Sequence, residues 1–120
     1  MDKITVIVAD DHPLFRQGVV DAISLESDIS VIGQAADGEQ ALKLIKSKSP
    51  NVAVLDIGMP GINGQQVTHH ITSEKLPTRV ILLTGYDDSE QILHAAIGGA
   101  AGYCSKDISK FHTKASTNSF

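Results

Sequence analysis

The sequence has one cysteine, no tryptophan and only 4% aromatic residues. The single cysteine, Cys104, excludes an internal disulfide and a metal site built from several cysteines, and it is typical of a reducing compartment. Long hydrophobic runs are also missing: the first apolar run covers only residues 4–9 before Asp10, too few for a signal-peptide core or a membrane span. These absences predict a cytoplasmic protein without membrane contact.

The sequence has fewer positively than negatively charged residues. Ten lysine and arginine residues stand against fourteen aspartate and glutamate residues, which gives a net charge of −4. Nucleic-acid binding depends on a basic surface, so we expect no contact between this domain and DNA or RNA. With 120 residues, of which 42% are hydrophobic, the chain is long enough for one domain with its own core.

Short apolar runs alternate with segments of helical periodicity. Runs rich in Val, Ile and Leu predict strands buried on both faces, with helices between them. The predicted strands cover residues 4–9, 30–35, 52–55, 80–83 and 100–104, and the fourth helix covers residues 88–97. The predicted inner face of the first helix consists of Leu14, Phe15, Val19, Ala22 and Ile23. This alternation predicts an α/β fold with a doubly wound parallel sheet.

The end of the sequence departs from this pattern. We expect residues 1–110 to form the domain and residues 111–120, with five Ser, Thr or Asn residues, to be an atypical tail. A fifth helix is therefore predicted to be short or missing, and the change in composition after Lys110 favours an end added by cloning or altered by a frame shift. Because a missing helix would expose apolar core surface, we expect a homodimer or larger association.

Polar residues follow the predicted strands at their carboxyl ends. They are Asp10, Asp11, Asp56, Thr84 and Lys106. In a parallel sheet these positions share the edge at which α/β folds bind ligands. Converging carboxylates suit Mg²⁺, and a lysine and a threonine beside them suit a phosphoryl group. Simpler interpretations remain open for single residues, because Asp11 could cap the first helix and Lys106 could be a surface charge.

Four segments resemble the motifs of response regulator receiver domains from two-component systems. They are residues 8–16 (VADDHPLFR), 55–64 (LDIGMPGING), 83–85 (LTG) and 102–106 (GYCSK). The similarity is strongest to the NarL/FixJ-like subgroup, whose members carry a C-terminal helix-turn-helix DNA-binding domain. It covers residues 3–110 and implies a flavodoxin-like, five-stranded parallel sheet of order 2-1-3-4-5.

The resemblance also implies a metal-dependent phosphoacceptor. Asp56 would take a phosphoryl group from the phosphohistidine of a sensor histidine kinase. Asp10, Asp11, Asp56 and the backbone carbonyl of Gly58 would hold Mg²⁺. Such a domain has self-phosphorylation and self-dephosphorylation chemistry but is not an enzyme in the usual sense.

Three further residues have roles implied by the family. Lys106 and Thr84 would contact the phosphoryl oxygens, and Thr84 and Tyr103 would be the switch residues. Added charge on the acceptor would bias a two-state equilibrium that is read by an effector, a helix-turn-helix transcription factor domain outside this sequence. His12 belongs to the first motif, but the resemblance implies no chemistry for it.

Three other functions fit the sequence less well. A phosphatase of the haloacid dehalogenase type needs a second Asp two residues after its nucleophile, where this chain has Gly58. A flavin-binding electron carrier would have hydroxyls and glycines after its first strand instead of Asp10 and Asp11. A pseudo-receiver that binds partners without phosphorylation is disfavoured by the complete set of strand-end residues.

Overall fold

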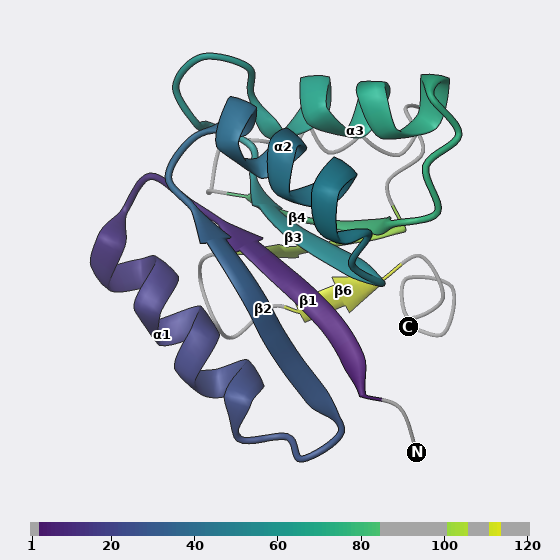
Figure 1. Ribbon diagram of the computed structural model, residues 1–120. Coiled ribbons are helices and arrows are strands. Elements are labelled where there is room, and N and C mark those ends of the chain that lie inside the picture. The colour runs from purple at the N-terminus through teal and green to yellow at the C-terminus, as the bar shows by residue number, and fades with distance from the viewer. Residues whose placement is uncertain (1–2, 85–100, 106–110, 114–120) are drawn as a thin grey trace.

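The computed structural model describes residues 3–84, 101–105 and 111–113 (Figure 1). Its elements, in chain order, are β1 (Ile4–Ala9), α1 (Pro13–Ser24), β2 (Ile29–Ala35), α2 (Gly38–Lys48), β3 (Val52–Asp56), α3 (Gly64–Ser73), β4 (Arg79–Thr84), β5 (Gly102–Ser105) and β6 (Phe111–Thr113). The fourth helix that the sequence predicts at residues 88–97 lies outside the described residues, as do residues 106–110 and 114–120 of the segment where the fifth helix was expected.

The sheet has the order β2-β1-β3-β4-β5-β6, and its first five strands are parallel. This confirms the predicted flavodoxin-like order 2-1-3-4-5. The structure adds a sixth strand that the sequence analysis did not predict, because β6 pairs antiparallel with β5 at the edge of the five parallel strands, with Gly102 opposite Thr113 and Cys104 opposite Phe111. An edge strand offers unpaired backbone groups to any extended segment, so this pairing needs no pattern of apolar side chains that a sequence would reveal.

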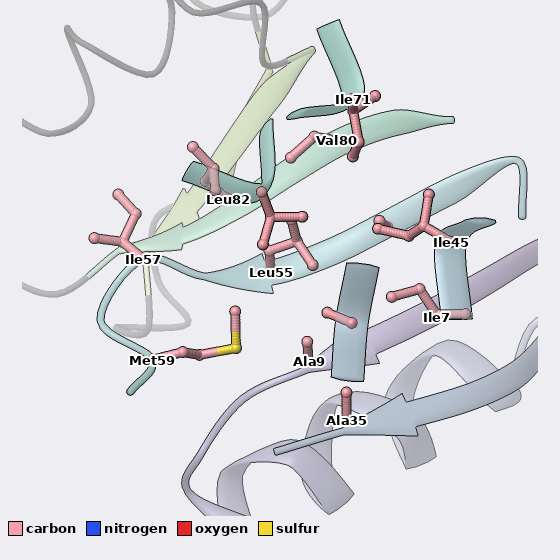
Figure 2. Packing of buried hydrophobic residues seen from close by; sticks show 13 residues of the cluster. Ile7, Ala9, Ala35, Ile45, Leu55, Ile57, Met59, Ile71, Val80 and Leu82 are labelled. Atoms are coloured by element: carbon pink, nitrogen blue, oxygen red, sulfur yellow. The ribbon is translucent and has the colours of Figure 1, made fainter. Parts of the chain in front are cut away.

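Helices cover the sheet on both faces. Alternate residues of each central strand point to opposite faces, so Ile7 of β1 packs with α2 and α3, whereas Val8 packs with α1. We call the first surface the α2/α3 face; Figure 2 shows its buried side chains, which are Ile7, Ala9, Ala35, Ala41, Ile45, Ala53, Leu55, Ile57, Met59, Val67, Ile71, Val80 and Leu82. The second surface, the α1 face, buries Val6, Val8, Val20, Val54 and Leu83.

The predicted inner face of α1 is partly wrong. Phe15, Val19 and Ile23 do pack towards the sheet, but Leu14 is 90% exposed and Val20 is the one residue of α1 that is buried. A helical wheel locates an apolar stripe only to within about one residue, and only the part of that stripe that contacts the sheet becomes buried. Leu14 and Ala22 therefore face away from the core.

Side-chain caps set the starts of the other two helices that the structure describes, α2 and α3. The Asp37 side chain accepts a hydrogen bond from the Gln40 backbone N–H of α2 at 2.8 Å, as the spacing of these residues predicts. In α3, Asn63 and Gln66 form a reciprocal capping box that the sequence analysis missed. This box matters for the site, because it anchors the far end of the loop that follows Asp56.

Candidate functional site: an acidic cluster at the carboxyl edge of the sheet

Three aspartates meet where β1 and β3 end. The two strands are parallel neighbours, with Ala9 paired with Leu55, so Asp10 and Asp56 leave the sheet side by side. Single ligand atoms of Asp10, Asp11, His12 and Asp56 lie within 4.8 Å of one another. The structure thus brings together the three aspartates that the sequence places at strand ends, and it adds a histidine.

The two inner carboxylates are held by backbone groups. Asp10 is fully buried and Asp56 is 4% exposed. The backbone N–H of His12 donates to Asp10 Oδ1 at 2.8 Å, and that of Gly58 donates to Asp56 Oδ1 at 3.1 Å. Arg16 Nη1 donates to the Asp10 carbonyl oxygen at 2.7 Å. These bonds fix both carboxylates before any ligand binds.

Asp11 does not cap the first helix. The N-cap residue of α1 is His12, no side-chain hydrogen bond caps this helix, and Pro13 occupies its first turn. Asp11 Oδ1 is shielded from solvent and accepts no hydrogen bond among the described residues, although His12 Nδ1 lies 3.2 Å from it. A shielded carboxylate oxygen that accepts no hydrogen bond is an atom that a bound cation would satisfy. The capping interpretation of Asp11 is therefore wrong, and its surroundings fit a ligand role.

His12 is the functional candidate that sequence reasoning missed. Its Nδ1 lies 3.0 Å from Asp10 Oδ1, 3.2 Å from Asp11 Oδ1 and 3.9 Å from Asp56 Oδ2. The side chain is 65% exposed to solvent. Its position directly after two aspartates is a weak signal, because an exposed histidine at a helix start is common.

Of the remaining predicted residues, Thr84 is fully described. It ends β4, is 2% exposed and pairs with Ser105 of β5, so it lies at the same edge as Asp56. Tyr103 lies in β5 in register with Leu82, but its side chain is outside the described part, and so is Lys106. The contact of Lys106 with a phosphoryl group and the movement of Tyr103 stay predictions.

The loop after Asp56 is tied back to the sheet. The Ile57 N–H donates to the Leu83 carbonyl at 3.1 Å, and the Gly64 N–H donates to the Ile57 carbonyl at 3.2 Å. An added Cβ on Gly64 would lie only 2.6 Å from the Asp56 carbonyl oxygen, so only glycine allows α3 to begin so close to the end of β3. Gly58 itself is exposed, two residues beyond Asp56.

The donor set of this cluster fits a divalent cation. It offers three carboxylates, which are the oxygen ligands that hard cations prefer, and one imidazole nitrogen. His12 is exposed and Asp11 is partly exposed, so an ion can enter from solvent. Three converging carboxylates repel one another, and a cation between them removes that repulsion.

Comparison with known proteins identifies the class. Residues 6–117 match the family model of the response regulator receiver domain. The chain therefore belongs to the response regulator receiver family, which makes it a signalling domain and not a classical enzyme.

Within that family the chain is similar to NarL proteins. It is 48% identical over 109 residues to the "Probable transcriptional regulatory protein NarL" of Mycobacterium tuberculosis, covering 91% of this chain and 50% of that protein. It is 36% identical over 107 residues to the nitrate/nitrite response regulator protein NarL of Escherichia coli K12, covering 89% of this chain and 50% of that protein. The solved signal receiver domain of M. tuberculosis NarL superposes with a TM-score of 0.86 at 48% identity, covering 89% of this chain and 86% of that domain.

These findings establish a NarL-type receiver domain of a two-component system. The chain spans about half the length of the curated relatives that it matches. Those relatives are transcription regulators by name. In the part of the chain that the structure describes, no helix has the length and apolar character that crossing a membrane requires.

Proposed function

We propose that this domain is switched by phosphorylation of Asp56. The observation that carries the proposal is the position of Asp56 at the end of β3, facing Asp10 and Asp11 across a cluster that fits a cation. A carboxylate oxygen of Asp56 forms a bond to phosphorus while the N–P bond of a kinase phosphohistidine breaks. The released imidazole nitrogen then takes a proton from solvent. Water later cleaves the acyl phosphate, which frees inorganic phosphate and restores the carboxylate.

The metal in this proposal is Mg²⁺, held by Asp10, Asp11, Asp56 and the backbone carbonyl of Gly58. When bound, it neutralises the negative charge that the phosphoryl group brings to the cluster. The protein contributes position: Arg16 holds the Asp10 backbone, and the Gly58 N–H holds one oxygen of Asp56. Preset donors of this kind need no reorganisation during transfer.

The proposed output runs through Thr84 and Tyr103. Thr84 and Lys106 contact the phosphoryl oxygens, and the shift of Thr84 leaves room for Tyr103 to turn. Support comes from Thr84, which is buried at the edge that also carries Asp56. Phosphorylation adds about −1.5 to −2 charge at one point, which biases an existing equilibrium between two conformations.

The proposed partners are a sensor histidine kinase and a helix-turn-helix effector domain in the whole protein, which contacts DNA in place of this domain. The net charge of −4 supports the second part. The proposed compartment is the cytoplasm, which the single cysteine suits.

We also propose that the 120-residue chain self-associates through its α1 face, where Phe15, Ile23 and Ile81 are only partly buried. A strictly monomeric species in light scattering would reject that association.

The test of the main proposal is intact-mass measurement after incubation with a small phosphodonor and Mg²⁺. We expect the wild-type domain to gain one acid-labile phosphoryl group, and to gain none when the metal is chelated. Asp56→Asn should gain none, whereas the matched variant Asp28→Asn, which changes an exposed aspartate elsewhere, should behave as the wild type. An undiminished gain in Asp56→Asn would remove Asp56 from its role.

A further inference from the structure

His12 brings a nitrogen donor into a cluster that otherwise offers oxygen. Its Nδ1 lies at 3.0, 3.2 and 3.9 Å from carboxylate oxygens of Asp10, Asp11 and Asp56, respectively. The nitrogen therefore sits among all three carboxylates, and not beside a single hydrogen-bond acceptor. Nothing in the proposed phosphoryl transfer uses this side chain.

The shortest of these separations is a hydrogen bond between the ring and Asp10, and all three also fit ligands that share one cation. Metal–ligand bonds of about 2.1 Å place two neighbouring ligands of an octahedral ion about 3.0 Å apart and two opposite ligands about 4.2 Å apart. The distances from His12 Nδ1 to Asp10 and Asp11 match the first value, and the distance to Asp56 approaches the second. The imidazole thus stands in position to bind an ion that the carboxylates also bind.

The backbone keeps His12 in this position. Its N–H donates to Asp10 Oδ1 at 2.8 Å, and Pro13, with its restricted backbone, starts α1 directly after it. The carbonyl of His12 accepts the Arg16 N–H at 2.9 Å as the first bond of the helix. The backbone of His12 is therefore attached on both sides to fixed structure and needs no ordering when an ion binds.

Nitrogen changes which cation a site prefers. Carboxylate and carbonyl oxygens suit Mg²⁺ and Mn²⁺, whereas imidazole suits Zn²⁺, Ni²⁺ and related transition metals. We propose that His12 is a nitrogen ligand of the acidic cluster and raises its affinity for a transition-metal dication such as Ni²⁺ or Co²⁺ above what the three carboxylates alone provide. The proposal rests on the cation site of the proposed function but concerns a residue that this function leaves unassigned.

The test compares cation binding by wild type, His12→Asn and His69→Asn in calorimetric titrations with Ni²⁺ and with Mg²⁺. Asparagine is a favourable N-cap residue, so His12→Asn preserves the start of α1 while removing the imidazole. His69 is an exposed histidine on α3 and serves as the matched control. We expect His12→Asn to lose at least about tenfold in Ni²⁺ affinity, equivalent to about 1.4 kcal/mol, with little change for Mg²⁺. His69→Asn should bind both ions as the wild type does.

Cobalt supplies a readout that does not depend on affinity alone. The visible absorption of bound Co²⁺ should differ between wild type and His12→Asn, because one nitrogen ligand is lost, and should be the same in His69→Asn. Equal Ni²⁺ affinity and an unchanged cobalt spectrum in His12→Asn would overturn the proposal and leave His12 as a hydrogen-bond partner of Asp10.

The cation titrations and the phosphorylation measurement together distinguish a failure of this inference from a failure of the proposed function. Metal-dependent phosphorylation of Asp56 together with His12-independent Ni²⁺ binding would reject the inference alone. His12-dependent Ni²⁺ binding without any phosphorylation would support the inference and reject the function. Unchanged Mg²⁺ and Ni²⁺ binding in Asp11→Ala would show that the cluster is not the cation site, and would reject both.

Discussion

The two faces of the sheet are built from the same strands but are covered differently. On the α2/α3 face, Ile45 of α2 and Val67 of α3 are 2% and 0% exposed. On the α1 face, the most buried residue of the described helix, Val20, is 9% exposed, and Phe15, Val19 and Ile23 are only partly buried. The strand residues are deeply buried on both faces, as Leu82 and Val8 show at 0% exposure, so among the described residues the difference lies in the helices.

This difference indicates where stability is concentrated. The α2/α3 face contains the continuous buried cluster of Figure 2, which extends from Ile7 to Ile57 and Met59 in the loop after Asp56. The acceptor loop is thus packed on the well-covered face. The α1 face, where Phe15, Val19 and Ile23 are only partly buried, leaves more accessible apolar surface for a partner.

The largest expected effect comes from truncating one isoleucine on each face. Ile45→Ala removes a fully buried side chain and should lower the free energy of unfolding by about 2–5 kcal/mol. Ile23→Ala removes a partly buried side chain of α1 and should cost roughly half of that. Urea denaturation of both variants gives the two values. Equal losses would contradict the comparison of the two faces.

The second-largest loss of stability is expected from substituting a buried glycine at the start of α2. An added Cβ on Gly38, at the start of α2, would overlap the carbonyl oxygen of Ile62 in the loop after Asp56. Gly38→Ala should therefore force α2 or this loop to shift, at a cost of about 1–3 kcal/mol. The same denaturation measurement tests it. Full wild-type stability would show that the contact between α2 and the acceptor loop adjusts freely.

An exposed glycine of α1, Gly18, should respond with the opposite sign. An added Cβ on Gly18, inside α1, would meet no atom within 4 Å. Gly18→Ala should stabilise the protein by about 0.5–1 kcal/mol, because alanine restricts the unfolded chain and favours helix. Ala22→Gly, an exposed change in the same helix, is the reverse control and should destabilise by a similar amount. A loss of stability in Gly18→Ala would mean that another part of the protein packs against α1 at Gly18.

The smallest effect concerns a salt bridge between α2 and α3. Lys46 Nζ lies 3.1 Å from Glu74 Oε1, and this bond lowers the pKa of Glu74, assisted by His70 at 3.5 Å. Since the folded pKa lies below the unfolded value of about 4.3, the contribution is present above that pH and disappears as the pH falls through the folded pKa. Because the pair is exposed, added salt should weaken the contribution further.

Stability measured between neutral and acidic pH tests this sign. Glu74→Gln should lose slightly less stability on acidification than the wild type does. Glu26→Gln, which changes an exposed carboxylate just beyond α1, is the matched control and should follow the wild-type curve. A steeper acid loss in Glu74→Gln would contradict the assigned direction.

Most of the sheet and the position of the site could be predicted from the sequence. Runs such as residues 4–9 and 52–55 are apolar on both sides of the strand, which requires helices on both faces and parallel pairing. Once the strands are parallel, Asp10, Asp56 and Thr84 must lie at one edge, because each directly ends a strand. Local pattern alone was sufficient for these features.

Other features were decided by tertiary contacts that no local pattern encodes. The sixth strand depends on backbone pairing with β5, and backbone groups are the same in every residue. The buried side of α1 depends on which part of its stripe reaches the sheet, which is why Val20 is inside and Leu14 outside. The chain segment of His12 places its ring beside Asp10, but the ring lies 3.9 Å from Asp56 only because β1 and β3 are neighbours.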